Sequence, residues 1–173
     1  MASDFKLMQF YDELIVKRNQ QTMLNSTYDK YKHMCVIIDS KSGEPLSYGY
    51  NIFKANSYKT EHAEAMALRK LLRKVDGSRR RICIDIFVVR TNGSNSKPCY
   101  YCLQNMYKHL YKFNIKMIYY SHEAEPTGIR REKFMTMYDS NEHHVSSYYR
   151  HNKARYPVPR VLSVYDTSSD SDS

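Results

Sequence analysis

The sequence predicts a three-layer α/β/α domain around a mixed central sheet. A β-branched apolar run at residues 33–39 and a second strand at 44–51, in which Tyr and Ser alternate, flank a turn-forming stretch at 40–43, which is typical of an antiparallel hairpin. Residues 82–89 are almost continuously apolar, as expected for a central strand covered on both faces. Residues 115–120 form a further strand that is reached through a helix, and such a crossover places two strands parallel. The sheet should therefore contain both kinds of pair.

Three amphipathic stretches are predicted to form the helices that cover this sheet. In residues 3–24, apolar side chains recur at steps of three and four after Ser3, which can cap the helix start. A second helix begins at His62, carries one apolar stripe and ends at residues 76–78. The third begins after Pro98, since proline is favoured where a helix starts. Its core-facing residues are expected to be Leu103, Met106, Tyr107 and Leu110.

The chain divides into four segments by composition. Residues 31–138 are predicted to form the main folded domain, with residues 1–30 as a packed N-terminal helix. Residues 139–160 form a basic, aromatic extension, and residues 161–173 an acidic, serine-rich tail of the kind that stays disordered. Within the domain, a loop is predicted to cross to the second helix and to form one wall of the pocket mouth, through Asn56, Tyr58 and Lys59.

The composition indicates a globular protein of a reducing compartment. The chain has 173 residues, 42% of them hydrophobic, which suffices for a core without disulfides. The four cysteines do not form a disulfide framework, because two are paired as Cys-x-x-Cys and two lie in apolar runs. No basic segment followed by an apolar one opens the sequence, and no run approaches the ~18 apolar residues of a membrane span. We expect a cytoplasmic or nuclear protein that is not secreted and does not contact a membrane.

Two short motifs, His62-Ala63-Glu64 and Pro98-Cys99-Tyr100-Tyr101-Cys102, predict a catalytic zinc (Zn2+) site. Such a site has three protein ligands and leaves its fourth position to water, and His62, Cys99 and Cys102 supply that set. The start of a helix stabilises the thiolate form of cysteine, which is the form that binds metal. Glu64 points about 200° around the helix from His62. It is therefore predicted to transfer protons and not to bind the ion.

A closed, structural zinc site is the alternative for these residues. Cys35 or Cys83 would then be the fourth ligand, but both lie in strand-like apolar runs, where a thiol is more often a small core residue. A structural site also gives no reason for Glu64. These considerations favour the open site.

The His-x-Glu and Pro-Cys-x-x-Cys motifs together resemble the signature of the zinc-dependent cytidine, deoxycytidylate and nucleic-acid-base deaminases. This resemblance covers roughly residues 33–121. It also includes Gly49-Tyr50-Asn51, which is similar to the G-[YW]-N motif of the deoxycytidylate and tRNA adenosine deaminases.

The resemblance implies a role for each motif residue. His62, Cys99 and Cys102 would bind zinc. Glu64 would be the general acid and base, and Asn51 would contact the sugar of the substrate. In the nucleic-acid-editing relatives an aromatic residue at the end of the fourth strand packs against the base, which makes Tyr119 the candidate here.

The reaction implied is hydrolytic deamination of a cytosine-type base. A free (deoxy)cytidine nucleotide or nucleoside is the expected substrate, because Gly49-Tyr50-Asn51 resembles the motif of the deoxycytidylate enzymes. One alternative is a deaminase that edits single-stranded DNA or RNA. Another is a zinc-fold binding protein that has lost activity, although the intact Glu64 argues against it. Relatives that act on free nucleotides are commonly oligomeric, so an oligomer is also among the expectations.

Nucleic acid is a candidate partner because the chain carries a net charge of +9, and such a surface attracts polyanions. Many basic proteins, however, bind no polyanion. The residues concerned form two basic patches: Arg69, Lys70, Arg73 and Lys74, and then Arg79, Arg80 and Arg81. They follow the second helix away from its zinc end, which favours the free substrate over a polymer.

Overall fold

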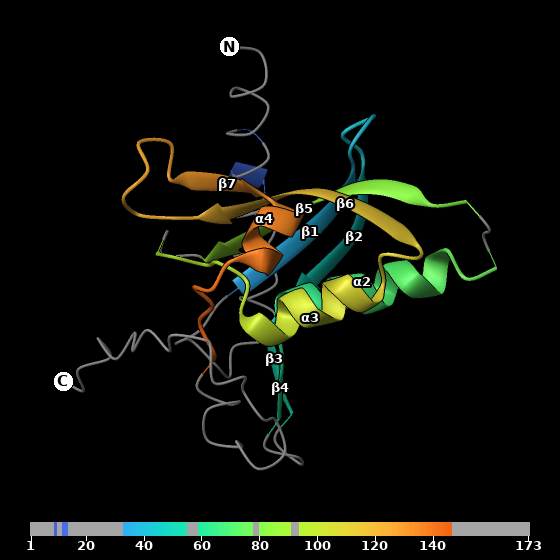
Figure 1. Cartoon of the computed structure of the whole chain (residues 1–173), viewed down its shortest axis with the longest axis horizontal. Helices are drawn as coiled ribbons and strands as arrows, with labels where there is room; N and C mark the ends of the chain where they lie inside the picture. The colour runs from blue at the N-terminus through green and yellow to red at the C-terminus, as the bar shows by residue number, and fades with distance from the viewer. Residues whose placement is uncertain are drawn as a thin grey trace.

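A five-stranded mixed sheet with helices α2 and α3 on one face forms the centre of the computed structural model (Figure 1). The structure describes residues 9, 12–13, 33–54, 59–77, 80–90 and 94–146. The strand order is β2-β1-β5-β6-β7. These strands are β1 (His33–Asp39), β2 (Pro45–Tyr50), β5 (Ile82–Arg90), β6 (Phe113–Ser121) and β7 (Ile129–Lys133). The helices are α2 (Ala63–Lys74), α3 (Tyr100–Lys108) and α4 (Phe134–Asp139).

The strand pairs confirm the mixed sheet. β1 pairs antiparallel with both β2 and β5, so the predicted hairpin is present, and β5 is parallel to β6 as the helical crossover requires. Strand β7 adds an antiparallel edge. Asp85, an acidic residue within the apolar β5, accepts a hydrogen bond from the backbone N–H of Met117 at 3.1 Å, and this contact explains how the carboxylate is tolerated there.

Two expectations for the elements around the sheet were wrong. The predicted loop after Asn51 contains a second, two-stranded sheet, formed by β3 (Ile52–Lys54) and β4 (Lys59–Glu61). Its β-branched and aromatic residues, Ile52, Phe53 and Thr60, favour strands. Asn56 and Tyr58 lie outside the described residues. Tyr107 does not face the core either, since it is 43% exposed and stacks on Tyr138, with the ring centroids 4.2 Å apart.

The core lies mainly between the sheet and helices α2 and α3. Ala67, Leu68 and Leu71 of α2 and Leu103 and Met106 of α3 are almost fully buried against strand residues. The opposite face of the sheet carries a separate apolar cluster, which consists of Met34, Val36, Ile38, Phe87 and Val89, with Tyr48 and Tyr119 packed against it.

The N-terminal helix that was expected to cover one face of the sheet falls almost entirely outside the described residues. Gln9, Asp12 and Glu13, the three that are described there, are helical and exposed. Residues 147–160 and the predicted tail at 161–173 also lie outside the described ranges. Within those ranges, no helix has the length and apolar character that crossing a membrane would require.

Gly49 brings strand β2 and helix α2 into direct backbone contact. A Cβ atom built on Gly49 would lie 2.1 Å from the carbonyl oxygen of Ala63 and 2.5 Å from the backbone nitrogen of Ala67. The neighbouring Ser47 donates a hydrogen bond to the Ala67 carbonyl at 2.7 Å. A glycine at this position thus has a packing reason, and it sets how closely the start of α2 approaches the sheet.

We expect Gly49→Ala to lower the free energy of unfolding by about 3 kcal/mol or more, because both clashing atoms belong to backbone that cannot rotate away. Because the clash lies next to the start of α2, zinc affinity should fall as well. Gly43→Ala is the control, since Gly43 has φ +76° and a Cβ added there would meet no atom within 4 Å. Its cost should be about 1 kcal/mol, with zinc binding unchanged. Urea unfolding and zinc titration measure both effects, and equal effects of the two variants would contradict this explanation.

Candidate metal centre

Two helices begin at the predicted site. His62 is the N-cap of α2, with φ −72° and ψ 151°, and Cys99 is the N-cap of α3, with φ −74° and ψ 163°. Cys102 lies in the first turn of α3. Neither N-cap side chain caps the backbone N–H groups of its own helix. The first N–H groups of a helix carry partial positive charge, so the two helix starts together favour thiolate ligands.

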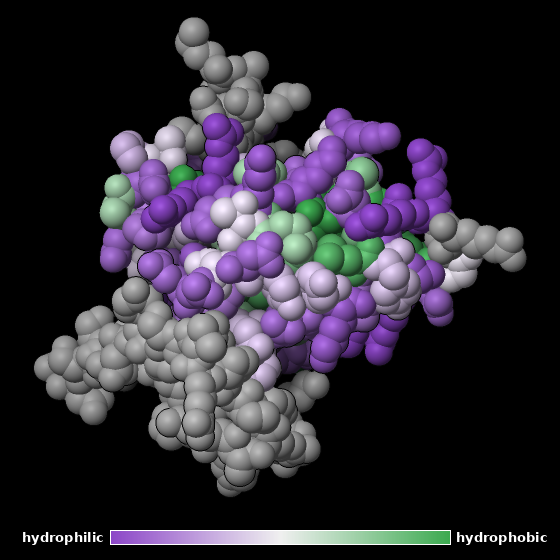
Figure 2. All heavy atoms as spheres, in the orientation of Figure 1, coloured by the Kyte–Doolittle hydropathy of each residue, from purple (hydrophilic) through white to green (hydrophobic). Residues whose placement is uncertain are grey.

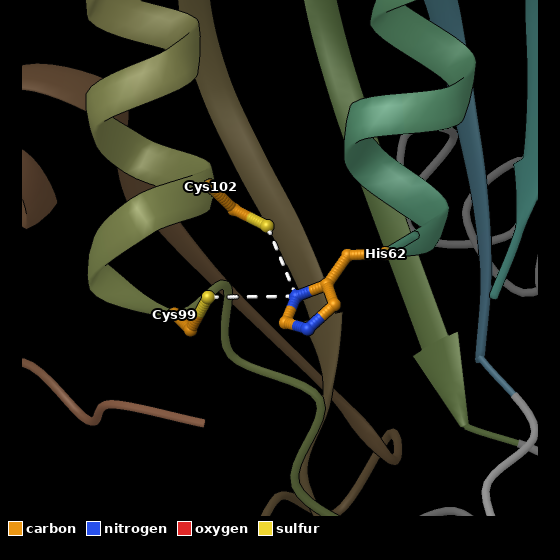
Figure 3. Close-up of side chains that lie close together, drawn as sticks. All are labelled: His62, Cys99 and Cys102. Atoms are coloured by element: carbon orange, nitrogen blue, oxygen red, sulfur yellow. Dashed lines mark hydrogen bonds between the residues drawn. The ribbon is translucent and has the colours of Figure 1, made fainter. Parts of the chain in front are cut away.

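The three predicted ligands lie together (Figure 3). The Nδ1 atom of His62 is 3.3 Å from Sγ of Cys102 and 3.5 Å from Sγ of Cys99, and all the ligand atoms lie within 4.8 Å of one another. In a tetrahedral zinc site, Zn–S bonds of about 2.3 Å and Zn–N bonds of about 2.0–2.1 Å place nitrogen and sulfur about 3.5 Å apart. The spacing of these side chains therefore fits zinc.

The ionisation of the cluster is consistent with a metal site. Burial by itself lowers the pKa of His62, but the neighbouring Cys99 thiolate outweighs burial and raises that pKa to about 9. The pKa of Cys99 is lowered, because its sulfur accepts a hydrogen bond from Cys102 and lies beside His62, whereas the pKa of Cys102 is raised by that same interaction. Zinc binds a neutral imidazole and two thiolates, so its binding would displace protons from this cluster.

Glu64 lies beside the cluster and outside the ligand set. It is 7% exposed, and its carboxylate interacts with His62 and with the Cys102 thiol. Desolvation by burial raises its pKa above the ordinary value, and the positive charge of His62 only partly opposes this. The carboxyl group can therefore hold a proton close to the three ligands.

The described residues contain no fourth cysteine ligand. The group that could hold a metal there consists of His62, Cys99 and Cys102. Cys35 is fully buried beneath the site, and burial raises its pKa well above the ordinary value, so it stays a thiol. Cys83 interacts with Asn114, whose Nδ2 lies 3.6 Å from the Cys83 sulfur. Neither Cys35 nor Cys83 therefore joins the three-residue group.

The two residues predicted to contact the substrate lie in different surroundings. Asn51 follows β2, and its side-chain oxygen accepts a hydrogen bond from the His33 N–H at 2.8 Å, so its contact with a sugar stays a prediction. Tyr119 lies apart from the ligands, and its contact with a base stays a prediction. Its ring stacks on Phe87 at 4.3 Å in the apolar cluster on the opposite face of the sheet, away from the helices that carry the ligands.

Two buried serines, which were not predicted, position the segment that leads to Cys99. The Ser96 hydroxyl donates a hydrogen bond to the Val88 carbonyl at 2.7 Å. The Ser96 oxygen accepts a hydrogen bond from the backbone N–H of Ser121 and lies 2.8 Å from the Ser121 hydroxyl oxygen. The Ser121 hydroxyl also lies 2.8 Å from the Ser94 carbonyl. These bonds join the segment to the ends of β5 and β6. Serine is common in loops, so nothing in the sequence indicated this network.

A short segment after α4 also packs against the ligand helix. The backbone N–H of Tyr100 donates to the His144 carbonyl at 3.0 Å, so one of the otherwise unbonded N–H groups at the start of α3 has a partner. His143 is 3% exposed, and its ring lies 5.7 Å from the Tyr100 ring. His143 and His144 of the predicted extension therefore pack against the start of α3.

A largely buried His-Cys-Cys set between two helix starts, with a carboxylate beside it, defines a zinc-binding domain. The family described as "Cytidine and deoxycytidylate deaminase zinc-binding region" matches residues 10–121, and the chain belongs to this family. Zinc is its metal, in agreement with the donor set described above. No curated protein matches the chain significantly.

Solved structures support the fold. Cytidine deaminase from Burkholderia pseudomallei superposes with a TM-score of 0.51 at 20% identity, over 73% of this chain and 94% of that one. Cytidine deaminase from Mycobacterium leprae has a TM-score of 0.47 at 18% identity, over 75% and 98% of the two chains. The first likeness shows that the fold is the cytidine deaminase α/β fold.

Proposed function

We propose that the protein is a hydrolytic deaminase that acts on the cytosine-type base of a free (deoxy)cytidine nucleotide or nucleoside. The observation that carries this proposal is the buried Glu64 carboxyl beside His62, Cys99 and Cys102. Membership of the deaminase family and the names of the structurally similar enzymes support it. In the reaction, water would replace the exocyclic amine of the base, so that a carbonyl forms and ammonia leaves.

Each residue would have a separate task. His62 Nδ1 and the two thiolates would hold zinc, which when bound lowers the pKa of a water molecule toward neutrality. Glu64 would accept a proton from that water and deliver it to the ring nitrogen of the base. It would then transfer a second proton, from the newly added hydroxyl group, to the leaving amine as the carbonyl forms. Its raised pKa suits this work, since a proton carrier is most effective when its pKa lies near the working pH. Asn51 would contact the sugar.

The contacts of the first basic patch favour a free substrate over a polymer. Arg69 forms a double hydrogen bond with Glu61, at 2.8 and 3.1 Å. Lys70 lies over the ring of Tyr50, and Lys74 donates to the Leu46 carbonyl at 2.8 Å. These cations already contact other groups of the protein. They are therefore less available to bind the phosphates of a nucleic acid strand that reaches the zinc end of α2.

A substrate panel tests the proposal. Zinc-loaded protein is incubated with cytidine, deoxycytidine, CMP, dCMP and a single-stranded oligonucleotide that contains cytosine, and the products are read by mass spectrometry. We expect turnover of a free nucleoside or nucleotide, with a Michaelis constant that changes little between about 50 and 200 mM salt. The binding affinity for a polymer held through three or four phosphates would instead fall about twenty- to fiftyfold over that range.

Two results would contradict the proposal. Deamination of the oligonucleotide alone would make the protein an editing enzyme. No turnover of any compound, by protein with one zinc per chain, would favour the zinc-fold binding protein without activity.

A further inference from the structure

The end of α3 and the turn that follows it expose aromatic and basic side chains in alternation. The sequence here is Tyr107-Lys108-His109-Leu110-Tyr111-Lys112. Tyr107 is 43% and Tyr111 68% exposed, and they are two of the three large hydrophobic residues that the described ranges leave exposed. Tyr107 stacks in parallel on Tyr138, so a pair of rings presents a flat surface.

Two arginines extend this surface. Arg81 donates through Nε to the Phe113 carbonyl at 3.2 Å, and the N–H of Ile82 donates to the Lys112 carbonyl at 3.1 Å. The segment that begins β5 therefore lies against the segment that begins β6. We call the combined area the Tyr-Lys surface, which consists of Arg80, Arg81, Tyr107, Lys108, Tyr111 and Lys112.

The Tyr-Lys surface is strongly positive. The described residues of the two connecting segments, 75–77, 80–82 and 107–113, include four lysines and arginines and a single acid, Asp76. Arg80, Arg81 and Lys108 are exposed. Hydrophilic side chains, drawn in purple, are spread over the face shown in Figure 2 and include those at its right-hand end, where α2 and α3 finish in Figure 1.

This surface is separated from the metal centre. The zinc ligands lie at the starts of α2 and α3, whereas the Tyr-Lys surface lies at their far ends. Arg80 follows the twelve residues of α2, which are about 18 Å long, and Tyr111 follows the nine residues of α3, which are about 14 Å long. Tyr107, in the last turn of α3, is about 8 Å along the helix axis from Cys102. A ligand on this surface therefore does not occupy the site of chemistry.

We propose that the Tyr-Lys surface binds single-stranded nucleic acid. The unpaired bases would stack on Tyr107 and Tyr111, and the lysines and arginines would contact the phosphates, which is the combination by which single strands are bound without sequence preference. A duplex presents phosphates but hides the faces of its bases. An anionic membrane presents charge without flat rings. The exposed tyrosines therefore favour the single strand. This proposal does not depend on the substrate of the zinc site.

Fluorescence anisotropy of a labelled oligo-dT of about 12 nucleotides tests it, with the full-length protein across a range of salt. We expect the log of affinity to fall with log salt at a slope of about −0.7 for each phosphate contacted. Tyr111→Ala should weaken binding roughly five- to hundredfold, because one stacking partner is lost, whereas Tyr111→Phe should keep most of the affinity. Tyr111 is 68% exposed, so neither change should disturb folding.

A charge-matched pair of double variants provides the control. Lys108→Ala with Lys112→Ala should reduce the salt slope by about 1.4, the contribution of two phosphates. Arg131→Ala with Lys133→Ala removes two exposed cations from β7 and should leave the slope unchanged. Cytidine turnover should be the same in all these variants, so this proposal and the proposed function can fail separately.

Three outcomes would overturn the proposal. Equal effects of the two double variants would mean that binding depends only on the net charge of the protein. Undiminished binding by Tyr111→Ala would exclude stacking. Binding to a duplex of the same length, or to vesicles of phosphatidylserine, that is as tight as to the single strand would assign the surface to another partner.

Discussion

Replacement of Cys102 by serine is expected to abolish stoichiometric zinc binding and to lower the stability of the protein. Sγ of Cys102 lies 3.3 Å from Nδ1 of His62 and belongs to the three-residue set that fits zinc. A serine hydroxyl does not ionise readily and is a poor ligand, so we expect zinc affinity to fall by more than about 100-fold, the upper effect of changes beside the ligands. Elemental analysis and competition with a chelator measure the loss.

The loss of stability follows from linkage. Zinc binds only the folded cluster, and a ligand present at about 1,000 times its Kd adds about 4.1 kcal/mol to the free energy of unfolding. The ion also connects the starts of α2 and α3, which otherwise share few contacts. Cys102→Ser should therefore unfold at the same urea concentration as the wild type treated with chelator, and added zinc should stabilise only the wild type.

Cys83→Ser is the matched control, because Cys83 is half-buried and lies outside the cluster. This variant should keep one zinc per chain. Wild-type protein that is fully folded and equally stable without metal would contradict the assignment of the centre.

The elements that were predicted correctly have strong local patterns. β5 is a nearly unbroken apolar run, and α2 carries its buried residues on one stripe, so periodicity alone locates both. The ligand set was also predictable, because His-x-Glu and Pro-Cys-x-x-Cys are each short segments. Their meeting in space follows from two helical connections between parallel strands: α2 leads from β2 to β5, and α3 leads from β5 to β6.

Tyr119 shows what local patterns leave open. Successive residues of a strand point to opposite faces, so the choice between Tyr119 and Tyr120 depends on the register of β6. The pairing of β5 with β6 shifts between Ile84 and Ile86, and no pattern in the sequence indicates that irregularity. As a result Tyr120 is buried in the core on the helix side, whereas Tyr119 packs on the other face.

Contacts between distant segments were also beyond local patterns. Ser96 and Ser121 are 25 residues apart and bond only because β5 and β6 end side by side. The helical spacing of Tyr107 predicted that it is buried in the core. In the structure it lies at the surface, where its ring stacks on the ring of Tyr138. Neither contact has a signal in the residues around it.

Replacement of Glu64 by glutamine is expected to remove turnover while zinc and fold remain. Glutamine has nearly the same shape, so the packing of this buried position is kept. It cannot accept and deliver a proton, and loss of general acid–base catalysis reduces kcat by about 10²- to 10⁴-fold. Deamination of the substrate found in the panel, and zinc content by elemental analysis, measure the two quantities.

Glu61→Gln is the control, since Glu61 lies just before His62 but pairs with Arg69 at the edge of the site. It should keep most of the activity.

Stability gives an independent check on the position of the carboxyl group. The pKa of Glu64 is raised in the folded state mainly by burial, so the folded protein disfavours the ionised form. At a pH above the ordinary carboxyl pKa, the cost of ionising the buried Glu64 lowers the free energy of unfolding. This loss of stability disappears as the pH falls below the ordinary carboxyl pKa. Glutamine carries no charge, so Glu64→Gln should be at least as stable as the wild type near neutral pH, and the advantage should vanish in acid. A variant that loses its zinc instead would make Glu64 a ligand and would exclude its role as the proton carrier.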